Sequence, residues 1–196
     1  MSIGQETRPR QEYIDYAEHI LTSSETHGRS SFPESPLNCP SGVFRTLIQS
    51  KACSANILEV INMVRDLTQV VLDLRKWSTL FGPAPEALDI SVLDTRKQSL
   101  IFRLLNLLPN PGDAYYEAIR LCAVLYANAI YYNTSFSEAA KSMGMAEFNG
   151  GIVASIREQL MRTDLSTCWG RMVGVLFWII LVSSAACNRR SRLPAR

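Results

Sequence analysis

The chain has 196 residues, of which 47% are hydrophobic, 9% aromatic and 19% charged, and its formal net charge is +2. This composition is typical of a globular protein, and the length fits one domain, or one domain with a tail. The charge lacks the strong basic excess of a domain that neutralises many phosphates, so we expect no direct nucleic-acid binding by this chain.

The cysteines and histidines show no pattern of a metal or catalytic site. The five cysteines are widely separated in the sequence: Cys39, Cys53, Cys122, Cys168 and Cys187. No pair has the short spacing that chelates zinc or frames a disulfide scaffold, so we expect reduced, mostly buried thiols. A catalytic cysteine needs a histidine beside it, and both His19 and His27 lie in a polar segment. We therefore expect no enzyme activity, no catalytic residue, no cofactor and no metal ion.

Residues 1–50 are rich in Ser, Thr, Pro, Gly, Glu and Arg, which predicts a mobile polar arm. Two short apolar groups allow parts of this arm to dock on the body as short helical turns: Tyr13, Tyr16 and Ile20, then Val43, Phe44, Leu47 and Ile48. The N-terminus lacks the apolar run of a secretory signal peptide, which indicates a cytosolic or nuclear protein.

The apolar spacing predicts three long helices, at residues 54–78, 89–108 and 113–132. In the first, apolar residues recur at steps of three and four from Ile57 to Leu74, with polar residues between them. Proline-containing segments at 81–85 and 109–112 separate the helices. Asp113 is placed to cap the third helix, because its carboxylate can accept a backbone N–H of the first turn.

Three further helical segments are predicted in the last third of the chain. Ser135 and Glu138 have the spacing of a capping box, which predicts a short helix up to about Met143. An amphipathic helix is expected over 152–162. Residues 169–186 are hydrophobic on all sides, and a helix of that kind is buried either in a helical domain or in a membrane.

These elements together predict an all-α fold, a right-handed or irregular antiparallel array of about six helices with a disordered N-terminal arm. We expect a helical domain over residues 51–190, between the arm of residues 1–50 and a basic tail of residues 191–196. No stretch alternates with the period of two that indicates a strand.

Two segments carry a resemblance to a known family. Residues 118–126, AIRLCAVLY, form a helix of small and apolar residues that ends in a tyrosine, and residues 168–178, CWGRMVGVLFW, join two tryptophans through a small turn and apolar residues. With the Ala-rich segment that follows, this order resembles the regulatory region behind the zinc binuclear cluster of fungal-specific transcription factors. The resemblance covers roughly residues 54–190.

The resemblance implies a helical, non-catalytic module in the nucleus that regulates transcription through contacts with other proteins or unidentified ligands. The family's DNA-binding head holds two zinc ions with six closely spaced cysteines, whereas the first half here offers only Cys39 and Cys53, so DNA binding is not carried over. The family's region runs on through further helices, so we expect the helical domain to be incomplete at its C-terminal end.

Trp169 and Trp178 are the candidate site residues. The simplest interpretation is that both indoles pack in the core with their N–H groups seeking a carbonyl. The alternative is that they line a groove for a ligand or a partner between helices. We expect protein partners or self-association, because the apolar perimeter of the last helix needs neighbours on all sides.

The alternative function is a tail-anchored membrane protein that uses the apolar segment 172–187, with the basic tail as its cytoplasmic flank. Arg171 at the edge of this segment and Trp178 at its middle are unusual for a membrane span. A third possibility is the family of helical apoptosis regulators, because residues 168–173 resemble its tryptophan-glycine-arginine segment. In that family a further motif and a membrane anchor follow this segment, and the present sequence does not contain them.

Overall fold

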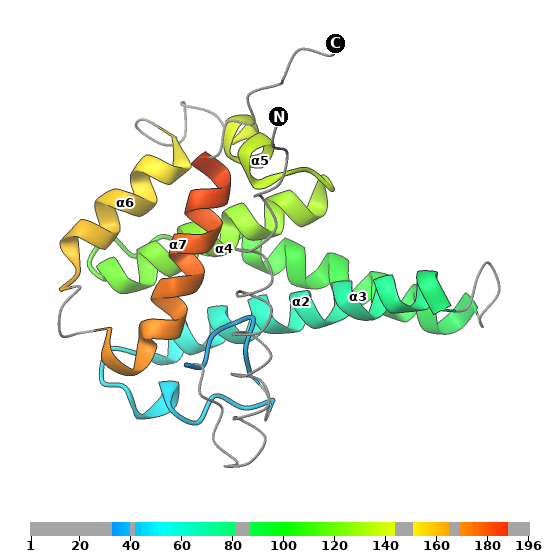
Figure 1. The fold of residues 1–196 in the computed structure, drawn as a ribbon, viewed down its shortest axis with the longest axis horizontal. Coiled ribbons are helices and arrows are strands. Elements are labelled where there is room, and N and C mark those ends of the chain that lie inside the picture. The colour runs from blue at the N-terminus through cyan, green and yellow to red at the C-terminus, as the bar shows by residue number, and fades with distance from the viewer. Residues whose placement is uncertain (1–32, 40–41, 81–86, 144–150, 165–168, 188–196) are drawn as a thin grey trace, which may run out of the picture. The chain divides into compact units, whose positions relative to one another are not determined.

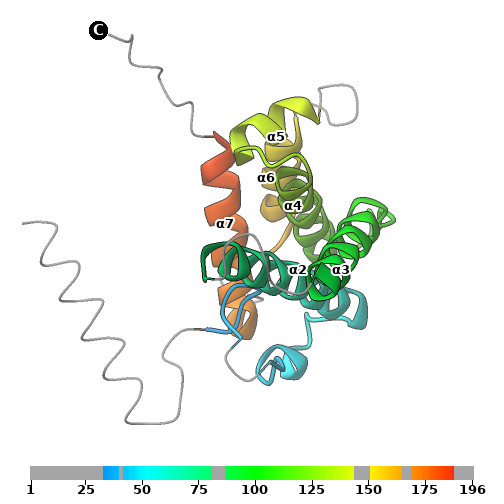
Figure 2. The same ribbon diagram turned by 90° about the vertical axis from the view of Figure 1, so that its right-hand side faces the viewer.

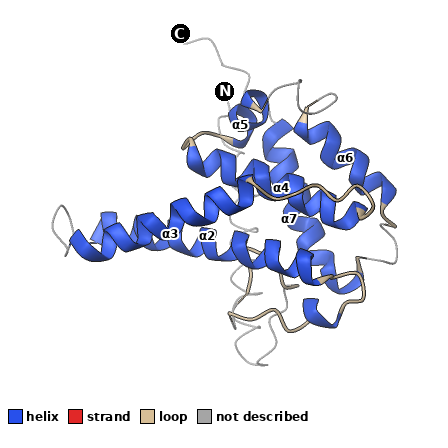
Figure 3. Cartoon of the chain, turned by 180° about the vertical axis from the view of Figure 1, so that it is seen from behind, coloured by secondary structure: helices blue, strands red, loops and turns tan. Residues whose placement is uncertain are grey.

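The computed structural model describes residues 33–39, 42–80, 87–143, 151–164 and 169–187. Across these residues the chain forms six α-helices and two 3-10 turns and no β-strand (Figures 1 and 3), which confirms the all-α class. The elements are η1 Leu47–Gln49, α2 Ala55–Leu80, α3 Ala87–Leu105, α4 Ala114–Tyr131, α5 Phe136–Ser142, α6 Ile152–Arg162, η2 Gly170–Met172 and α7 Val173–Cys187. Residues 1–32 and 188–196, which hold most of the predicted arm and the basic tail, lie outside the described residues.

α2 and α3 lie side by side as an antiparallel pair (Figures 1 and 3). Of the apolar positions predicted from the spacing of three and four, Ile57, Ile61, Val64 and Leu67 are each 0% exposed. Leu58, Val71 and Leu74 are only partly buried, and Val60, Met63 and Val70 are buried as well. α3 ends three residues before the predicted boundary at residue 108, so Leu108 lies beyond the helix and is exposed. Its carbonyl oxygen accepts a hydrogen bond from the Tyr116 hydroxyl at 3.0 Å, which fastens the proline-containing turn to α4.

α4 is the central helix and packs against α2, α3, α5, α6 and α7 (Figure 2). Asp113 caps it as predicted, since its side chain accepts the backbone N–H of Tyr116 at 2.9 Å. Small residues such as Ala118, Ala123 and Ala127 are fully buried, which allows neighbouring helices to approach closely. The body is therefore built around α4.

α5 and α6 cover two further sides of α4. The predicted capping box is confirmed at the start of α5: the Ser135 hydroxyl accepts the backbone N–H of Glu138 at 3.2 Å, and the Glu138 carboxylate accepts the Ser135 N–H at 3.0 Å. α6 buries Ile152 and Ile156 on one side, in line with its predicted amphipathic pattern. Both helices also contact α7.

α7 begins at Val173, four residues later than predicted, because residues 170–172 form the 3-10 turn η2. The helix lies at the edge of the helical body beside α4, α5 and α6 (Figure 2). One side of it is buried, through Gly174, Val175, Trp178, Ile179, Val182 and Ala186. The other side faces outward.

The described part of the predicted arm from Glu34 onward belongs to the body. Phe44 and Leu47 are 1% and 0% exposed and lie in the core, whereas Val43 and Ile48 are exposed. The expected docking of this apolar group as a short helical turn is thus observed, in η1. The structure therefore places packed chain well before the domain boundary predicted at residue 51, because these two large apolar side chains are better buried than solvated.

Candidate functional site

The outward side of α7 is the most unusual surface of the described chain. Its exposed large apolar residues are Val173 at 46%, Phe177 at 60%, Ile180 at 46% and Leu181 at 47% exposure. Their spacing of four, three and one places them in one stripe, which spans about 12 Å at the rise of an α-helix. We call this stripe the outer face of α7. The helix carries no charged residue over its fifteen positions, so the stripe is apolar from end to end.

The two tryptophans lie on the buried side and not on the outer face. Trp178 is 1% exposed, and its ring meets the ring of Tyr126 on α4 edge-on at 6.2 Å between centroids. Its indole N–H has no hydrogen-bond partner among the described residues. The contact with Tyr126 places Trp178 between α7 and α4.

Trp169 is also 1% exposed but packs elsewhere in the core. Its indole N–H donates to the hydroxyl of Thr163 at 3.0 Å, and its ring lies 5.2 Å from the ring of Tyr115 near the start of α4. The structure thus brings the two candidate residues against different parts of α4 and does not bring them together. Their burial fits core packing, the simpler of the two interpretations.

Arginines flank α7 on both sides in the sequence. Arg171 is exposed in η2 and donates to the side-chain oxygen of Gln49, which ties η2 to η1. At the other end of α7, the sequence continues with four arginines in nine residues, which lie outside the described part of the chain: Arg189, Arg190, Arg192 and Arg196. The apolar stripe is therefore flanked by positive charge in the sequence.

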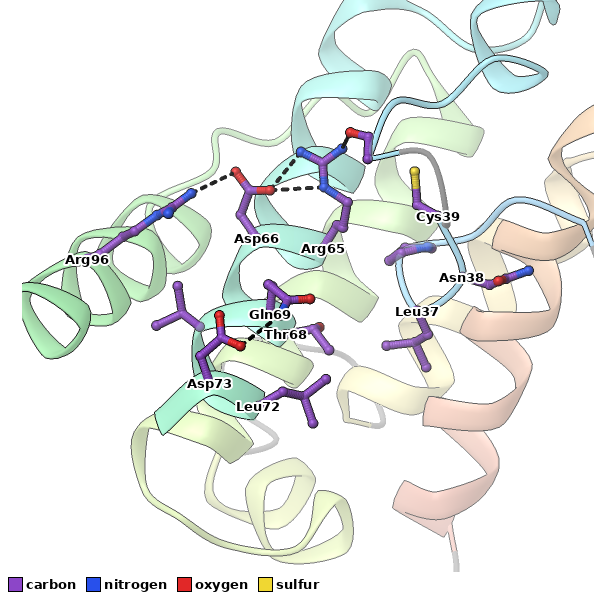
Figure 4. Close-up of a pocket in the computed structure, with 13 residues that line it drawn as sticks. Leu37, Asn38, Cys39, Arg65, Asp66, Thr68, Gln69, Leu72, Asp73 and Arg96 are labelled. Atoms are coloured by element: carbon purple, nitrogen blue, oxygen red, sulfur yellow. Dashed lines mark hydrogen bonds and ion pairs between the residues drawn. The ribbon is translucent and has the colours of Figure 1, made fainter. Parts of the chain in front are cut away.

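A second feature is a groove of about 510 Å³ between the chain around Asn38 and α2 (Figure 4). Three of its charged side chains pair with one another, and the fourth, Asp73, accepts a hydrogen bond from the Gln69 amide at 2.9 Å. The Asp66 carboxylate accepts from Nη2 of Arg65 at 2.7 Å and forms an ion pair with Arg96 at 3.7 Å. Arg65 also donates to the carbonyl of Gly42 and lies over the Phe44 ring at 5.4 Å. We interpret these contacts as a fastening that holds the chain around Phe44 on α2.

A third feature is a cleft of about 530 Å³ between α2, the C-terminal end of α4 and the start of α5, which we call the α2–α4 cleft. Its described lining is Thr68, Val71, Leu72, Leu74, Arg75, Lys97, Tyr126, Ala129, Ile130, Tyr131, Asn133, Thr134 and Phe136. These residues come from four helices and a turn, so sequence spacing alone gave no signal of the cleft.

A buried ion pair lies at the start of α4. Glu117 is 6% exposed, and its carboxylate accepts from Nε of Arg120 at 3.0 Å and from Nη2 at 2.8 Å. It also accepts the backbone N–H of Asn110, from the turn that precedes α4. Because both partners are fully engaged, we assign the pair to the fold and not to chemistry.

The four described cysteines are free thiols, and the prediction that they are mostly buried is wrong: Cys122 is buried, Cys39 and Cys53 are partly buried, and Cys187 is exposed. Burial raises the pKa of the Cys122 thiol well above its ordinary value of 9.0, and burial also raises the pKa of Cys53, so both stay protonated at neutral pH. Within the described part of the chain, no three side chains of His, Cys, Asp or Glu gather where they could hold a metal ion.

Residues Gly170–Cys187 are long and apolar enough to cross a membrane, with a mean hydropathy of 1.8 over 18 residues. The core helix of a globular protein meets the same criterion, and 39% of this window is buried in the body. In comparisons with known proteins, no family model, curated protein or solved structure matches the chain.

Proposed function

We propose that this chain is a non-catalytic, transcription-regulator-like helical interaction module that acts in the nucleus and binds a protein partner through the outer face of α7. It would be a relative or a portion of the regulatory region of fungal zinc binuclear cluster transcription factors. The observation that carries the proposal is the contrast within α7, an uncharged helix that is firmly packed on one side and presents four large apolar side chains on the other.

The shape of the outer face suits a single amphipathic helix. Its four side chains form a stripe one helix wide, which a partner helix can match with apolar residues at i, i+3, i+4 and i+7. A stable interface between two globular bodies buries about 800 Å² on each partner, which is more than one narrow stripe supplies. The occupant we infer is therefore a helix of a protein partner.

The charges next to the stripe favour an acidic partner helix over a second copy of this chain. Arg171 precedes α7, and Arg189 and Arg190 follow it. Two copies paired in parallel would align like ends, and two copies in antiparallel would bring Arg171 of one close to the arginines of the other, so both arrangements place like charges together. Acidic residues at the two ends of a partner helix would instead attract these arginines.

Membrane anchoring by the same segment is the second candidate, favoured by its mean hydropathy of 1.8. To span a bilayer, α7 would have to leave the body and expose the partners of its buried side. Val175 and Ile179 are 0% exposed and Trp178 is 1% exposed, so that step would remove the contacts of three large side chains. The packing thus supports a protein-bound helix more than an anchor.

The test measures binding of a synthetic amphipathic peptide that has a leucine stripe and glutamates elsewhere. We expect Phe177→Glu to weaken binding of this peptide by about tenfold or more, because the substitution places a carboxylate in the apolar stripe next to an acidic ligand. Met161→Glu is the matched control, since Met161 is 71% exposed on α6 and is not one of the four residues of the stripe. Fluorescence anisotropy with the full chain gives both affinities.

Four results would contradict the proposal. The first is equal loss of binding in both variants, and the second is equal binding of a peptide with lysines in place of glutamates. The third is a dimer in light scattering that Phe177→Glu converts to a monomer, which assigns the outer face to a second copy. The fourth is resistance of the native protein to alkaline carbonate extraction from membranes, which assigns the segment to a bilayer.

A further inference from the structure

The α2–α4 cleft has the dimensions and chemistry of a small-molecule site. Its volume of about 530 Å³ falls in the range of ligand pockets, roughly 300–1,000 Å³. It uses none of the residues of the outer face of α7, so an inference about it stands independently of the proposed function. Three properties of its lining define the ligand: a hydroxyl pair, an aromatic wall and a pair of cations.

The hydroxyl pair joins α2 to α4 across the cleft. Thr68 Oγ1 lies 2.9 Å from the Tyr126 hydroxyl oxygen and 2.8 Å from the carbonyl oxygen of Val64. Thr68 has one proton, and when it donates that proton to Val64, the hydroxyl proton of Tyr126 is free to turn toward Thr68 or toward another acceptor. Tyr126 can therefore donate a hydrogen bond to a bound oxygen without leaving the Thr68 donor unsatisfied.

The aromatic wall is formed by Tyr126 and Phe136. Their ring centroids are 5.8 Å apart and their planes are tilted by 30°, so the two rings pack against each other at the cleft. Val71 and Ile130 add branched apolar side chains to the same lining. This wall suits a flat aromatic or a branched apolar group.

The cations are Arg75 on α2 and Lys97 on α3. None of the described lining residues is acidic. Lys97 Nζ forms an ion pair with Asp94 at 3.5 Å, but Asp94 is 56% exposed, and a pair of this kind contributes little. Burial raises the pKa of Tyr126, and the hydrogen bond with Thr68 and then the charge of Arg75 oppose this effect. The lining thus favours an anionic ligand.

We propose that the α2–α4 cleft binds a small monocarboxylic acid with a flat aromatic or branched apolar body. The carboxylate interacts with the two cations and accepts the Tyr126 hydroxyl proton, and the apolar body lies against Phe136 and Ile130.

The experiment compares 2-naphthoate with 2-naphthamide, which have the same ring system and differ in the charge. With the full chain, we expect 2-naphthoate to bind at least about tenfold more tightly than the amide in isothermal titration calorimetry, and to raise the melting temperature accordingly. Lys97→Gln should remove most of this preference, since it deletes one cation without changing the amide contact.

Arg103→Gln is the matched control, because Arg103 also lies on α3 and pairs with Glu59 at 2.9 Å, outside the described lining of the cleft. A second variant, Thr134→Trp, fills the cleft at an exposed position and should abolish binding of both probes with unchanged stability. The proposal is overturned if 2-naphthoate and 2-naphthamide bind equally, or if neither binds at millimolar concentration. It is also overturned if Lys97→Gln and Arg103→Gln weaken binding of 2-naphthoate to the same extent, or if Thr134→Trp leaves binding intact.

Discussion

α4 and α7 reverse the usual relation between composition and burial. α4 contains Glu117 and Arg120, yet eleven of its eighteen residues are buried. α7 contains no charged residue, yet only six of its fifteen residues are buried and four large apolar side chains remain exposed. The difference shows that the position of a helix in the packing, rather than its apolar content, decides how much of it is covered.

The two helices meet their neighbours differently. α4 is in contact with α2, α3, α5, α6 and α7, so both its apolar and its small residues are enclosed. Its charged pair lies in the first turns, where the Glu117 carboxylate accepts hydrogen bonds from Arg120 and from the backbone N–H of Asn110. Among the described helices, α7 packs against α4, α5 and α6. The four large apolar side chains of its outer face stay exposed.

The largest expected effect tests the two sides of α7 with adjacent residues. Trp178→Ala should lower the free energy of unfolding by about 3–5 kcal/mol, because it empties a fully buried site beside Tyr126. Phe177→Ala, at 60% exposure, should change it by no more than about 0.5 kcal/mol. Urea unfolding followed by circular dichroism measures both. Similar losses in the two variants would show that both sides of α7 are covered in solution.

The next effect concerns the charges that α4 keeps in its buried first turns. Glu117→Gln should cost about 3 kcal/mol, because Arg120 then remains in a largely buried place without its counter-charge. Replacing both residues, by Glu117→Gln with Arg120→Met, should cost less than the sum of the single changes. Additive losses in the same unfolding assay would show that the two side chains act independently.

The sequence predicted the local parts of this comparison well. Asp113 and the Ser135–Glu138 pair were identified as helix caps because their partners lie within three residues along the chain. The buried side of α7 was not identified, since a helix that is apolar all round has no periodicity to indicate its orientation. The α2–α4 cleft was missed because its walls come from elements separated by up to about sixty residues, such as Thr68 and Tyr126.

Packing at small residues sharpens the comparison with a smaller effect. Ala127→Leu should destabilise the fold by about 1–3 kcal/mol. The Ala127 side chain is 0% exposed where α4 packs against its neighbours, so the added atoms have no space. Ala185→Leu enlarges an exposed position of α7 and should change stability by less than about 0.5 kcal/mol. Thermal unfolding of both variants gives the result, and a destabilised Ala185→Leu protein would mean that α7 is enclosed at that position.

The smallest effect lies where the chain before α2 meets the start of α7 through η1 and η2. The Glu34 carboxylate accepts the Thr46 hydroxyl at 2.7 Å and three backbone N–H groups of residues 45–47 at 2.8, 2.8 and 3.2 Å, and so caps η1. Burial alone raises the pKa of Glu34, but these hydrogen bonds outweigh it, so its pKa lies below the ordinary value of 4.5.

A lowered carboxyl pKa stabilises the folded state above the unfolded-state pKa, and that contribution is lost as the pH falls through the folded-state value. Glu34→Gln should therefore cost about 1 kcal/mol at pH 7, the usual loss for a helix-capping side chain, and the difference from the native chain should shrink as the pH falls below 4.5. Glu158→Gln, at an exposed position of α6, is the control and should show no such convergence. Urea titrations at stepped pH measure the difference, and a Glu34→Gln loss that stays constant with pH would show that it does not depend on ionisation of the carboxylate.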